Sequence, residues 1–220
     1  MLVGKVVTRE LVLKLVQLVG VRLTTQQAAK FVPVAGTTRN NYKLQTDRPR
    51  AVTELNTAGP AVSRTALRAL RGRVLRAGAR CVVLSGSLPP GAPPAIYRDW
   101  IVALRRRGVP AVLDASGTAL RLGLQARPWL VKPNRQEAEE LLGRPLRRLA
   151  DYRAALGRLL SRGPSVAILS LGPEGALMGC GSPAAYWLAR GPAIRTASAV
   201  GAGDSLIGGF LWGWAGTRSA

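Results

Sequence analysis

Two hydrophobic patterns alternate along the chain from about residue 80 onward. Short runs of consecutive aliphatic residues predict strands over 81–87, 110–116, 129–134 and 165–172. Apolar residues that recur every three or four positions predict helices over 93–108, 134–143, 151–163 and 201–214. The last of these helices is apolar on every side, so we expect it to be buried. Regular alternation of strand and helix predicts an α/β fold in which helices cover both faces of a mainly parallel sheet.

Polar or small residues follow each predicted strand. They read SGS at 85–87, DAS at 114–116, KPN at 132–134 and SLG at 170–172. Ligands of parallel α/β sheets bind beyond the carboxyl ends of the strands. We therefore expect a functional site where these four segments meet.

Residues 31–59 have a different pattern. Two strand-like segments flank the turn-prone sequence TDRPR, which predicts a β-hairpin apart from the parallel sheet. We divide the chain into an unassigned segment over 1–30, this hairpin over 31–59 and an α/β core over 60–220.

The amino-acid composition limits which kinds of catalytic and metal sites the chain can form. The chain has 220 residues, 47% of them hydrophobic, which is enough for a sizeable core. It contains no histidine, which excludes a Ser-His-Asp triad, a Cys-His dyad and histidine-ligated metals. Cys81 and Cys180 lie in apolar runs far apart, so we expect buried free thiols in a reducing compartment.

The net charge is +21, with 32 basic and 11 acidic residues. Such a charge is typical of nucleic-acid binding, but the arginines are scattered and are not interleaved with aromatic residues. We therefore expect a positive surface that attracts phosphorylated small molecules, and no nucleic-acid partner. No run of apolar residues is long enough to span a membrane, and no secretory signal is apparent, so we expect a cytoplasmic protein without a membrane partner.

The sequence GAGD at 201–204 is the first candidate for chemistry. Its glycines and alanine let successive N–H groups face one point at the start of a helix, which is an anion site. Asp204 adds a proton acceptor there, the combination that phosphoryl transfer to an alcohol requires. The alternative is that Asp204 only caps the helix.

Three further motifs have both a functional and a structural interpretation. In KPNRQE, Asn134 and Glu137 have the spacing of magnesium–nucleotide ligands, or of a capping box. SLGPEG at 170–175 provides amides for a nucleotide, or a tight hairpin. The serines of SGSLPPG at 85–91 could bind a sugar or phosphate oxygen, or end the strand.

Together with FVPVAGTTRNNYKL, these motifs resemble the PfkB branch of the ribokinase-like carbohydrate kinases, and within it the sugar-phosphate kinases. The resemblance covers about residues 31–214 and implies a three-layer ribokinase-like fold with a small β-lid. It implies ATP and Mg²⁺ as cofactors and a hexose monophosphate as substrate, most closely fructose 1-phosphate. Tagatose 6-phosphate and fructose 6-phosphate are alternatives, and homodimerisation through the lid is a further expectation.

The resemblance also assigns roles to individual residues. Asp204 corresponds to the catalytic base, and Gly201, Ala202 and Gly203 to the anion hole. Arg39 and Ser87 correspond to the sugar-phosphate ligands, Asn134 and Glu137 to the Mg²⁺-nucleotide ligands, and Ser198 and Val200 to a site for K⁺ in some relatives. Asp114 is either a helper of the metal or a strand-end cap. The nucleotide site comprises Lys132, Asn134, Ser170, Leu171, Gly172, Pro173, Glu174, Gly175 and Gly203.

The chain departs from the family pattern at both ends. An Asn-Pro-Ala-x-Asp motif, a Gly-Gly-Lys-Gly-x-Asn segment and the helices after GAGD are all lacking. We therefore expect the central and catalytic portion of a kinase. A non-catalytic kinase remnant and a basic nucleic-acid-binding module are the alternatives from other functional classes.

Overall fold

The computed structural model describes residues 32–37, 59–181, 184–191 and 201–217, together with the backbone of 17–18, 41–45 and 52–56. The chain divides into two compact units. One contains a two-stranded sheet, and the other contains a seven-stranded sheet with most of the helices. No helix in the described ranges is both long and apolar enough to cross a lipid bilayer.

The smaller unit contains an antiparallel pair, β2 (Asn41–Gln45) and β3 (Val52–Asn56). Asn41 pairs with Asn56, and Gln45 pairs with Val52. A two-stranded pair therefore forms within the predicted hairpin segment. Its role as a lid, and the division at residues 30 and 59, stay predictions.

The large sheet has the strand order β1-β4-β5-β6-β7-β8-β9. Its parallel centre consists of β4 (Val82–Ser85), β5 (Ala111–Asp114), β6 (Leu130–Val131) and β7 (Val166–Ser170). Antiparallel strands flank this centre: β1 (Gln17–Leu18), β8 (Ala176–Cys180) and β9 (Ala185–Ala189). All four predicted strands are present, which confirms the mainly parallel α/β sheet.

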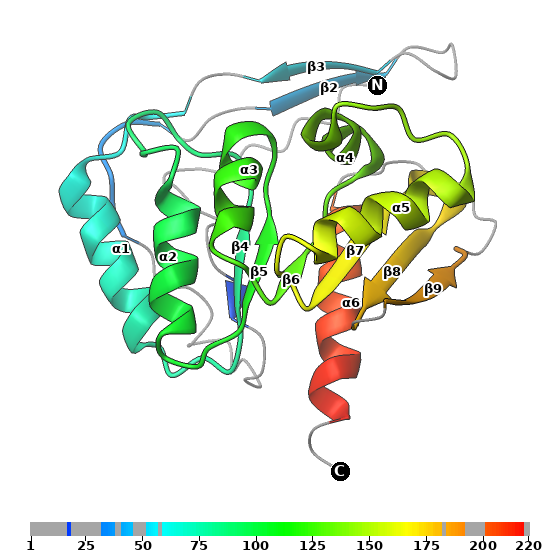
Figure 1. Cartoon of the computed structure of the whole chain (residues 1–220). Coiled ribbons are helices and arrows are strands. Elements are labelled where there is room, and N and C mark those ends of the chain that lie inside the picture. The colour runs from blue at the N-terminus through cyan, green and yellow to red at the C-terminus, as the bar shows by residue number, and fades with distance from the viewer. Residues whose placement is uncertain are drawn as a thin grey trace. The chain divides into compact units, whose positions relative to one another are not determined.

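Helices lie on both faces of this sheet, as predicted (Figure 1). One face carries α2 (Ile96–Arg105), α3 (Gly117–Gln125) and α5 (Leu149–Leu160), whereas α6 (Ala202–Gly216) lies on the other. The remaining helices are α1 (Arg64–Arg76) and α4 (Arg135–Leu142), which precede β4 and follow β6 in the chain. The predicted helices are confirmed, whereas α3 was not predicted because GTALRLGLQ contains two glycines, which lower helix propensity.

The core consists of alternate strand residues packed against one stripe of each helix. Val83, Val112 and Leu130 form a cluster with Ile207 and Leu211 of α6. These two residues are the only fully buried ones in α6. Trp212, in contrast, is 83% exposed. The prediction of an entirely buried helix is therefore wrong, because only one stripe of α6 packs against the sheet.

The cysteines are free thiols, as predicted, but only Cys81 is fully buried, while Cys180 is half-buried. Burial raises the pKa of Cys81 to about 11, so this thiol stays protonated and unreactive at neutral pH.

Candidate active site

The four predicted polar segments follow the four parallel strands at the same edge of the sheet. Strand β4 ends at Ser85, β5 at Asp114, β6 at Val131 directly before Lys132, and β7 at Ser170. The N-terminus of α6 also reaches this edge, which we name the carboxyl edge. It is the region in which the site residues that the structure describes come together.

Helix α6 begins at a left-handed glycine. Gly201 is the N-cap residue, with φ 81° and ψ 0°, a conformation that favours glycine because a Cβ would clash with the backbone. The carbonyl oxygen of Gly201 accepts the first helical hydrogen bond, from Ser205 N at 2.8 Å. The N–H groups of Ala202, Gly203 and Asp204 have no intrahelical acceptor, so they form a potential anion site at the positive end of the helix dipole.

The structure argues against the capping interpretation of Asp204. The N-cap is Gly201, and Asp204 lies three residues later in the first turn, without a capping hydrogen bond. Within the described part of the chain, Asp204 makes no hydrogen bond or ion pair. The residue is half-buried.

Lys132 is the one fully buried charged residue in the described part of the chain, at 4% exposure. Its Nζ lies 2.9 Å from Oδ1 of Asp114, so each charge compensates the other. A Cβ placed on Gly203 would lie 3.3 Å from the same Nζ. The ammonium group is therefore packed directly against the first turn of α6. The absence of a side chain on Gly203 leaves room for this ammonium group.

Asp114 connects the buried ammonium to the loop after β4. Its Oδ2 accepts a hydrogen bond from Ser85 Oγ at 3.4 Å, and its backbone oxygen accepts one from Gly86 N at 2.9 Å. The two predicted roles of Asp114 were a helper of the metal and a strand-end cap. The structure shows a partner that neither role included, the ammonium of Lys132. The sequence placed both Asp114 and Lys132 at strand ends, but it did not predict that their side chains are in contact.

Tyr97 of α2 fixes the same loop and was not predicted as a site residue. Its side chain is fully buried, and its hydroxyl donates to the carbonyl oxygens of Ser85 at 3.1 Å and Gly86 at 2.9 Å. Burial, and then the charge of Asp114, raise the pKa of Tyr97 above its usual range, so the phenol remains a donor. A tyrosine one residue into an amphipathic helix carries no sequence signal for this role.

Asn134 and Glu137 form the capping box that was one of their two predicted interpretations. Glu137 N donates to Asn134 Oδ1 at 2.8 Å, and Asn134 N donates to Glu137 Oε2 at 2.9 Å. Burial raises the pKa of Glu137, and the backbone N–H of Asn134 and the charge of Lys132 oppose that shift. The capping box places this carboxylate in the electrostatic field of the buried ion pair, so it does not exclude the nucleotide role.

The turn after β7 is the predicted tight hairpin. Gly172–Glu174 form a 3₁₀ turn, and Ser170 pairs with Ala176 across it. Residues Asn134 and Ser170 form a parallel bridge, so the KPN and SLG segments lie side by side. At Gly175, where φ is 100°, a Cβ would collide with the carbonyl oxygen of Ala189, which explains the glycine. Leu171 is buried, and Pro173 lies within the exposed turn.

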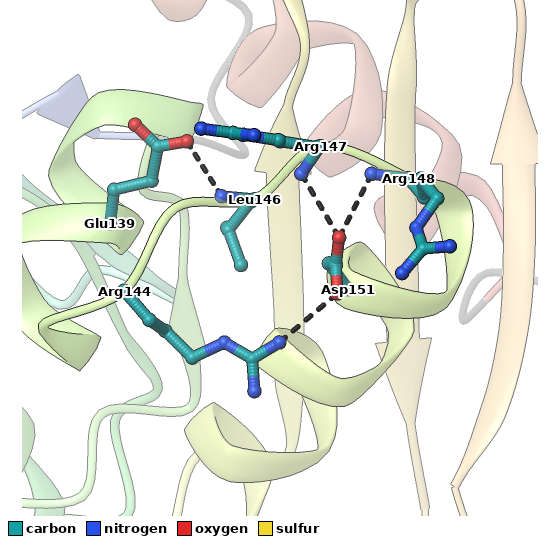
Figure 2. A network of polar contacts seen from close by, with 6 residues as sticks. All are labelled: Glu139, Arg144, Leu146, Arg147, Arg148 and Asp151. Atoms are coloured by element: carbon teal, nitrogen blue, oxygen red, sulfur yellow. Dashed lines mark hydrogen bonds and ion pairs between the residues drawn. The ribbon is translucent and has the colours of Figure 1, made fainter.

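The loop between α4 and α5 is held by a network of polar contacts (Figure 2). Glu139 Oε1 accepts from Leu146 N at 2.8 Å. Asp151 accepts from the backbone N–H groups of Arg147 and Arg148 and pairs with Arg144 at 3.0 Å. These two N–H groups lower the pKa of Asp151. The network fixes the end of α4, the helix that Asn134 caps at its start.

Not every predicted site residue is positioned. Arg39, Ser198 and Val200 lie outside the described residues. Ser87 is exposed and follows Gly86, the residue held by Tyr97 and Asp114. The roles of all these residues in binding stay predictions.

Comparisons with known proteins show the family to which the chain is related. Residues 28–219 match the model of the pfkB family of carbohydrate kinases. The chain is 39% identical over 188 residues to 1-phosphofructokinase of Escherichia coli K12, covering 84% of this chain and 59% of that relative. It therefore spans less than two thirds of that relative's length.

Two solved structures of Escherichia coli phosphofructokinase-2 are also similar. The tetrameric inhibited form matches with a TM-score of 0.77 and 29% identity, over 87% of this chain and 64% of that one. The complex with fructose-6-phosphate matches with a TM-score of 0.71 and 30% identity, over 80% and 58% of the two chains.

Proposed function

The chain belongs to the pfkB family of carbohydrate kinases, and from that premise we propose that it is the catalytic portion of an ATP-dependent kinase for a hexose monophosphate. The observation that carries this proposal is the juxtaposition at the start of α6. The carboxylate of Asp204, which has no partner among the residues that the structure describes, belongs to the same helical turn as Gly203, against which the buried ammonium of Lys132 packs. A proton acceptor and the first-turn amides, with an ammonium group packed against them, suit phosphoryl transfer.

Each group has a role in the proposed reaction. Asp204 takes the proton of the acceptor hydroxyl, whose oxygen forms a bond to the γ-phosphorus of ATP. The bond from that phosphorus to the bridging oxygen breaks, and ADP leaves. The first-turn amides of α6 and the Lys132 ammonium stabilise the negative charge on the phosphoryl oxygens. Asp114 keeps the ammonium in position.

The residues present also suit a magnesium–nucleotide. No group of three or more acidic, cysteine or histidine side chains gathers anywhere in the described ranges. Mg²⁺ that arrives with phosphates needs only one or two carboxylates and keeps several waters. Glu137 would supply such a carboxylate and Asn134 an amide oxygen, and the ion would neutralise phosphate charge. A K⁺ ion at Ser198 and Val200, and homodimerisation through the hairpin, remain parts of this proposal.

Fructose 1-phosphate is the substrate that we propose, with fructose 1,6-bisphosphate as product. The support is the similarity to curated relatives named 1-phosphofructokinase, at 36–39% identity. A 6-phosphate substrate is the second candidate, supported by the similar fold of the phosphofructokinase-2 complex with fructose-6-phosphate. Arg39 and Ser87 are the proposed phosphate ligands in either case.

A substrate panel tests the proposal. ADP release is measured with MgATP and fructose 1-phosphate, fructose 6-phosphate or tagatose 6-phosphate, with nucleotide binding measured in parallel. We expect the highest kcat/KM with fructose 1-phosphate. Preference for a 6-phosphate would select the second candidate. Nucleotide binding without turnover of any sugar phosphate would contradict the kinase and support the non-catalytic remnant.

A further inference from the structure

The opposite edge of the parallel sheet gathers arginines that are scattered in the sequence. Helices α1, α2, α3 and α5 end at this edge, and their chains turn there into β4, β5, β6 and β7 (the lower edge of the sheet in Figure 1). We name it the arginine edge and define it by the segments 74–82, 104–111, 125–130 and 157–166. It contains eight exposed arginines and no acidic residue: Arg76, Arg80, Arg105, Arg106, Arg107, Arg127, Arg158 and Arg162.

Compensation of helix dipoles explains only part of this cluster. A cation in the last turn stabilises the negative end of a helix. Arg105 donates to the carbonyl oxygen of Ala126 at 3.3 Å, and Arg107 donates to that of Leu75 at 2.6 Å. Four helix ends need about one cation each, whereas eight arginines are present. The four ion pairs in the described part of the chain include none of the eight.

Arg127 is held in an unfavourable backbone conformation. It is the only non-glycine residue with positive φ in the described ranges, at 55°. The corresponding left-handed position after the other helices on this sheet is glycine, for example Gly108 after α2 and Gly163 after α5. A Cβ on Gly163 would lie 2.5 Å from Cγ of Arg127, so Gly163 makes room for the arginine stem. Strain of this kind is a reason to look for a function of the guanidinium group.

A cavity opens between these turns. Its volume is about 350 Å³, and its lining includes Arg105, Arg127, Pro110, Pro128 and Trp129. The ring of Trp129 packs on Trp214 of α6 with centroids 4.5 Å apart, which fixes the indole. A cavity lined by two arginines, a tryptophan and two prolines is a place where a base can lie against apolar groups while its phosphates contact arginines.

From this arrangement we propose that the arginine edge binds single-stranded nucleic acid, with one base in the Trp129 cavity and the phosphodiester chain along the arginines. The sequence argued against a nucleic-acid partner because its arginines are scattered and separate from aromatic residues. The fold changes that premise, since it brings them to one edge and places Trp129 among them. This inference is independent of the proposed kinase reaction, which uses the opposite edge.

Binding of a labelled single-stranded oligonucleotide of about 12 nucleotides tests the proposal, since such sites span roughly 4–16 nucleotides. Fluorescence anisotropy over a salt series gives the affinity and its salt dependence for the full chain. The variant pair Arg106→Gln/Arg127→Gly removes two charges from the arginine edge. The control pair Arg68→Gln/Arg71→Gln removes two exposed charges from α1 outside it.

The edge variant should bind more weakly, and its slope of log affinity against log salt should be shallower by about 1.4, because each lost contact with a single strand removes about 0.7. The control pair should retain the wild-type slope. Glycine suits the left-handed position, so Arg127→Gly should not lower the melting temperature. If that variant fails to fold, Arg106→Gln/Arg162→Gln provides the same comparison.

Three outcomes would overturn the proposal. The first is that the wild type does not bind the oligonucleotide. The second is an equal loss of affinity in the edge and control pairs, which would mean that net charge alone attracts the strand. The third is preferential displacement of the strand by anionic phosphatidylserine vesicles. Asp204→Asn should bind the oligonucleotide like the wild type, which separates this site from the kinase site.

Discussion

The two edges of the parallel sheet differ in how their charges are arranged. At the carboxyl edge, charges of both signs meet, and the four ion pairs of the described residues all belong to strand ends and helix starts there or to the loop network beside them: Arg98–Asp99, Lys132–Asp114, Arg135–Glu174 and Arg144–Asp151. At the arginine edge, eight exposed cations lie in segments that contain no acidic residue. One edge is electrostatically compensated, and the other is not.

Helix dipoles explain why each edge carries charges of a particular sign. They do not explain why a charged side chain is buried at the carboxyl edge. Acids occupy the first turns of α2, α4, α5 and α6 at the carboxyl edge, and cations follow the helix ends at the other. Among the residues whose burial the structure describes, the one buried ammonium group, that of Lys132, lies at the carboxyl edge. A buried ion pair is expensive to desolvate and is weak evidence for stability. From this difference we infer that the carboxyl edge is organised for the proposed phosphoryl transfer, and the arginine edge for attracting an anionic partner to its surface.

The largest effect on the fold is expected from breaking the buried pair. Lys132→Met leaves the Asp114 carboxylate buried without its cation, which should lower the free energy of unfolding by about 3–5 kcal/mol. Urea denaturation measures the loss. The double variant Lys132→Met/Asp114→Asn removes both charges and should recover part of it. Additive losses in the double variant would show that the two groups do not compensate each other.

The glycine against which Lys132 packs gives the next largest effect. Gly203→Ala puts a methyl group 3.3 Å from Lys132 Nζ, displacing the ammonium and the first-turn amides. We expect kcat/KM to fall by up to about 10²-fold, the cost of misplacing a catalytic group by about 1 Å. Gly208→Ala is the matched control, because it lies in the same helix with open space around it.

In the control, better helix propensity should stabilise the fold by up to about 1 kcal/mol without loss of activity. Equal activity in the two variants would mean that the space beside Gly203 has no catalytic importance.

Glu137→Gln should separate stability from nucleotide affinity. Burial raises the pKa of Glu137, so its charged form destabilises the native state above that pKa, and protonation relieves the cost as the pH falls toward the usual carboxyl range. Glutamine retains an acceptor for Asn134 N but carries no charge. The variant should therefore melt slightly higher than the wild type at pH 7, with the difference shrinking toward pH 4.

The same variant should bind MgATP more weakly, because the carboxylate for the metal is lost. Melting curves across pH, with a nucleotide titration, provide both readouts. A lower melting temperature at pH 7 would contradict the assignment of a costly buried charge.

The smallest effect is expected in the loop network. Asp151→Asn weakens the acceptor of two backbone N–H groups, so amide exchange at Arg147 and Arg148 should accelerate a fewfold without global unfolding. Because these contacts lower the pKa of Asp151, their contribution is present above the usual carboxyl pKa and is lost as the pH falls through the lowered value. Unchanged exchange at both amides would exclude this role.

The order of strands and helices was predictable because periodicity reports burial directly. The runs before Ser85, Asp114, Lys132 and Ser170 are aliphatic, and parallel strands have to end at one edge, so the location of the candidate site followed from the strand pattern. The Asn134 capping box was also readable, because it depends on residues only three apart.

Contacts between distant residues could not be predicted in the same way. The Lys132–Asp114 pair, the approach of Lys132 to Gly203 and the hydroxyl of Tyr97 all depend on how separate elements pack. The arginine edge shows the same limit, since arginines at four helix ends are far apart in the chain and adjacent only in the fold. The apolar pattern of α6 likewise predicted burial on all sides, but the sheet covers only the Ile207 and Leu211 stripe.

The most direct test of the kinase site is the rate of the phosphoryl-transfer step in Asp204→Asn. A rapid-quench single-turnover experiment with labelled ATP and fructose 1-phosphate isolates this step from substrate binding. Asparagine cannot take the hydroxyl proton, so the rate should fall by about 10²–10⁴-fold, the usual contribution of a general base, while ATP affinity and melting temperature stay near those of the wild type. A single-turnover rate equal to that of the wild type would contradict Asp204 as the base.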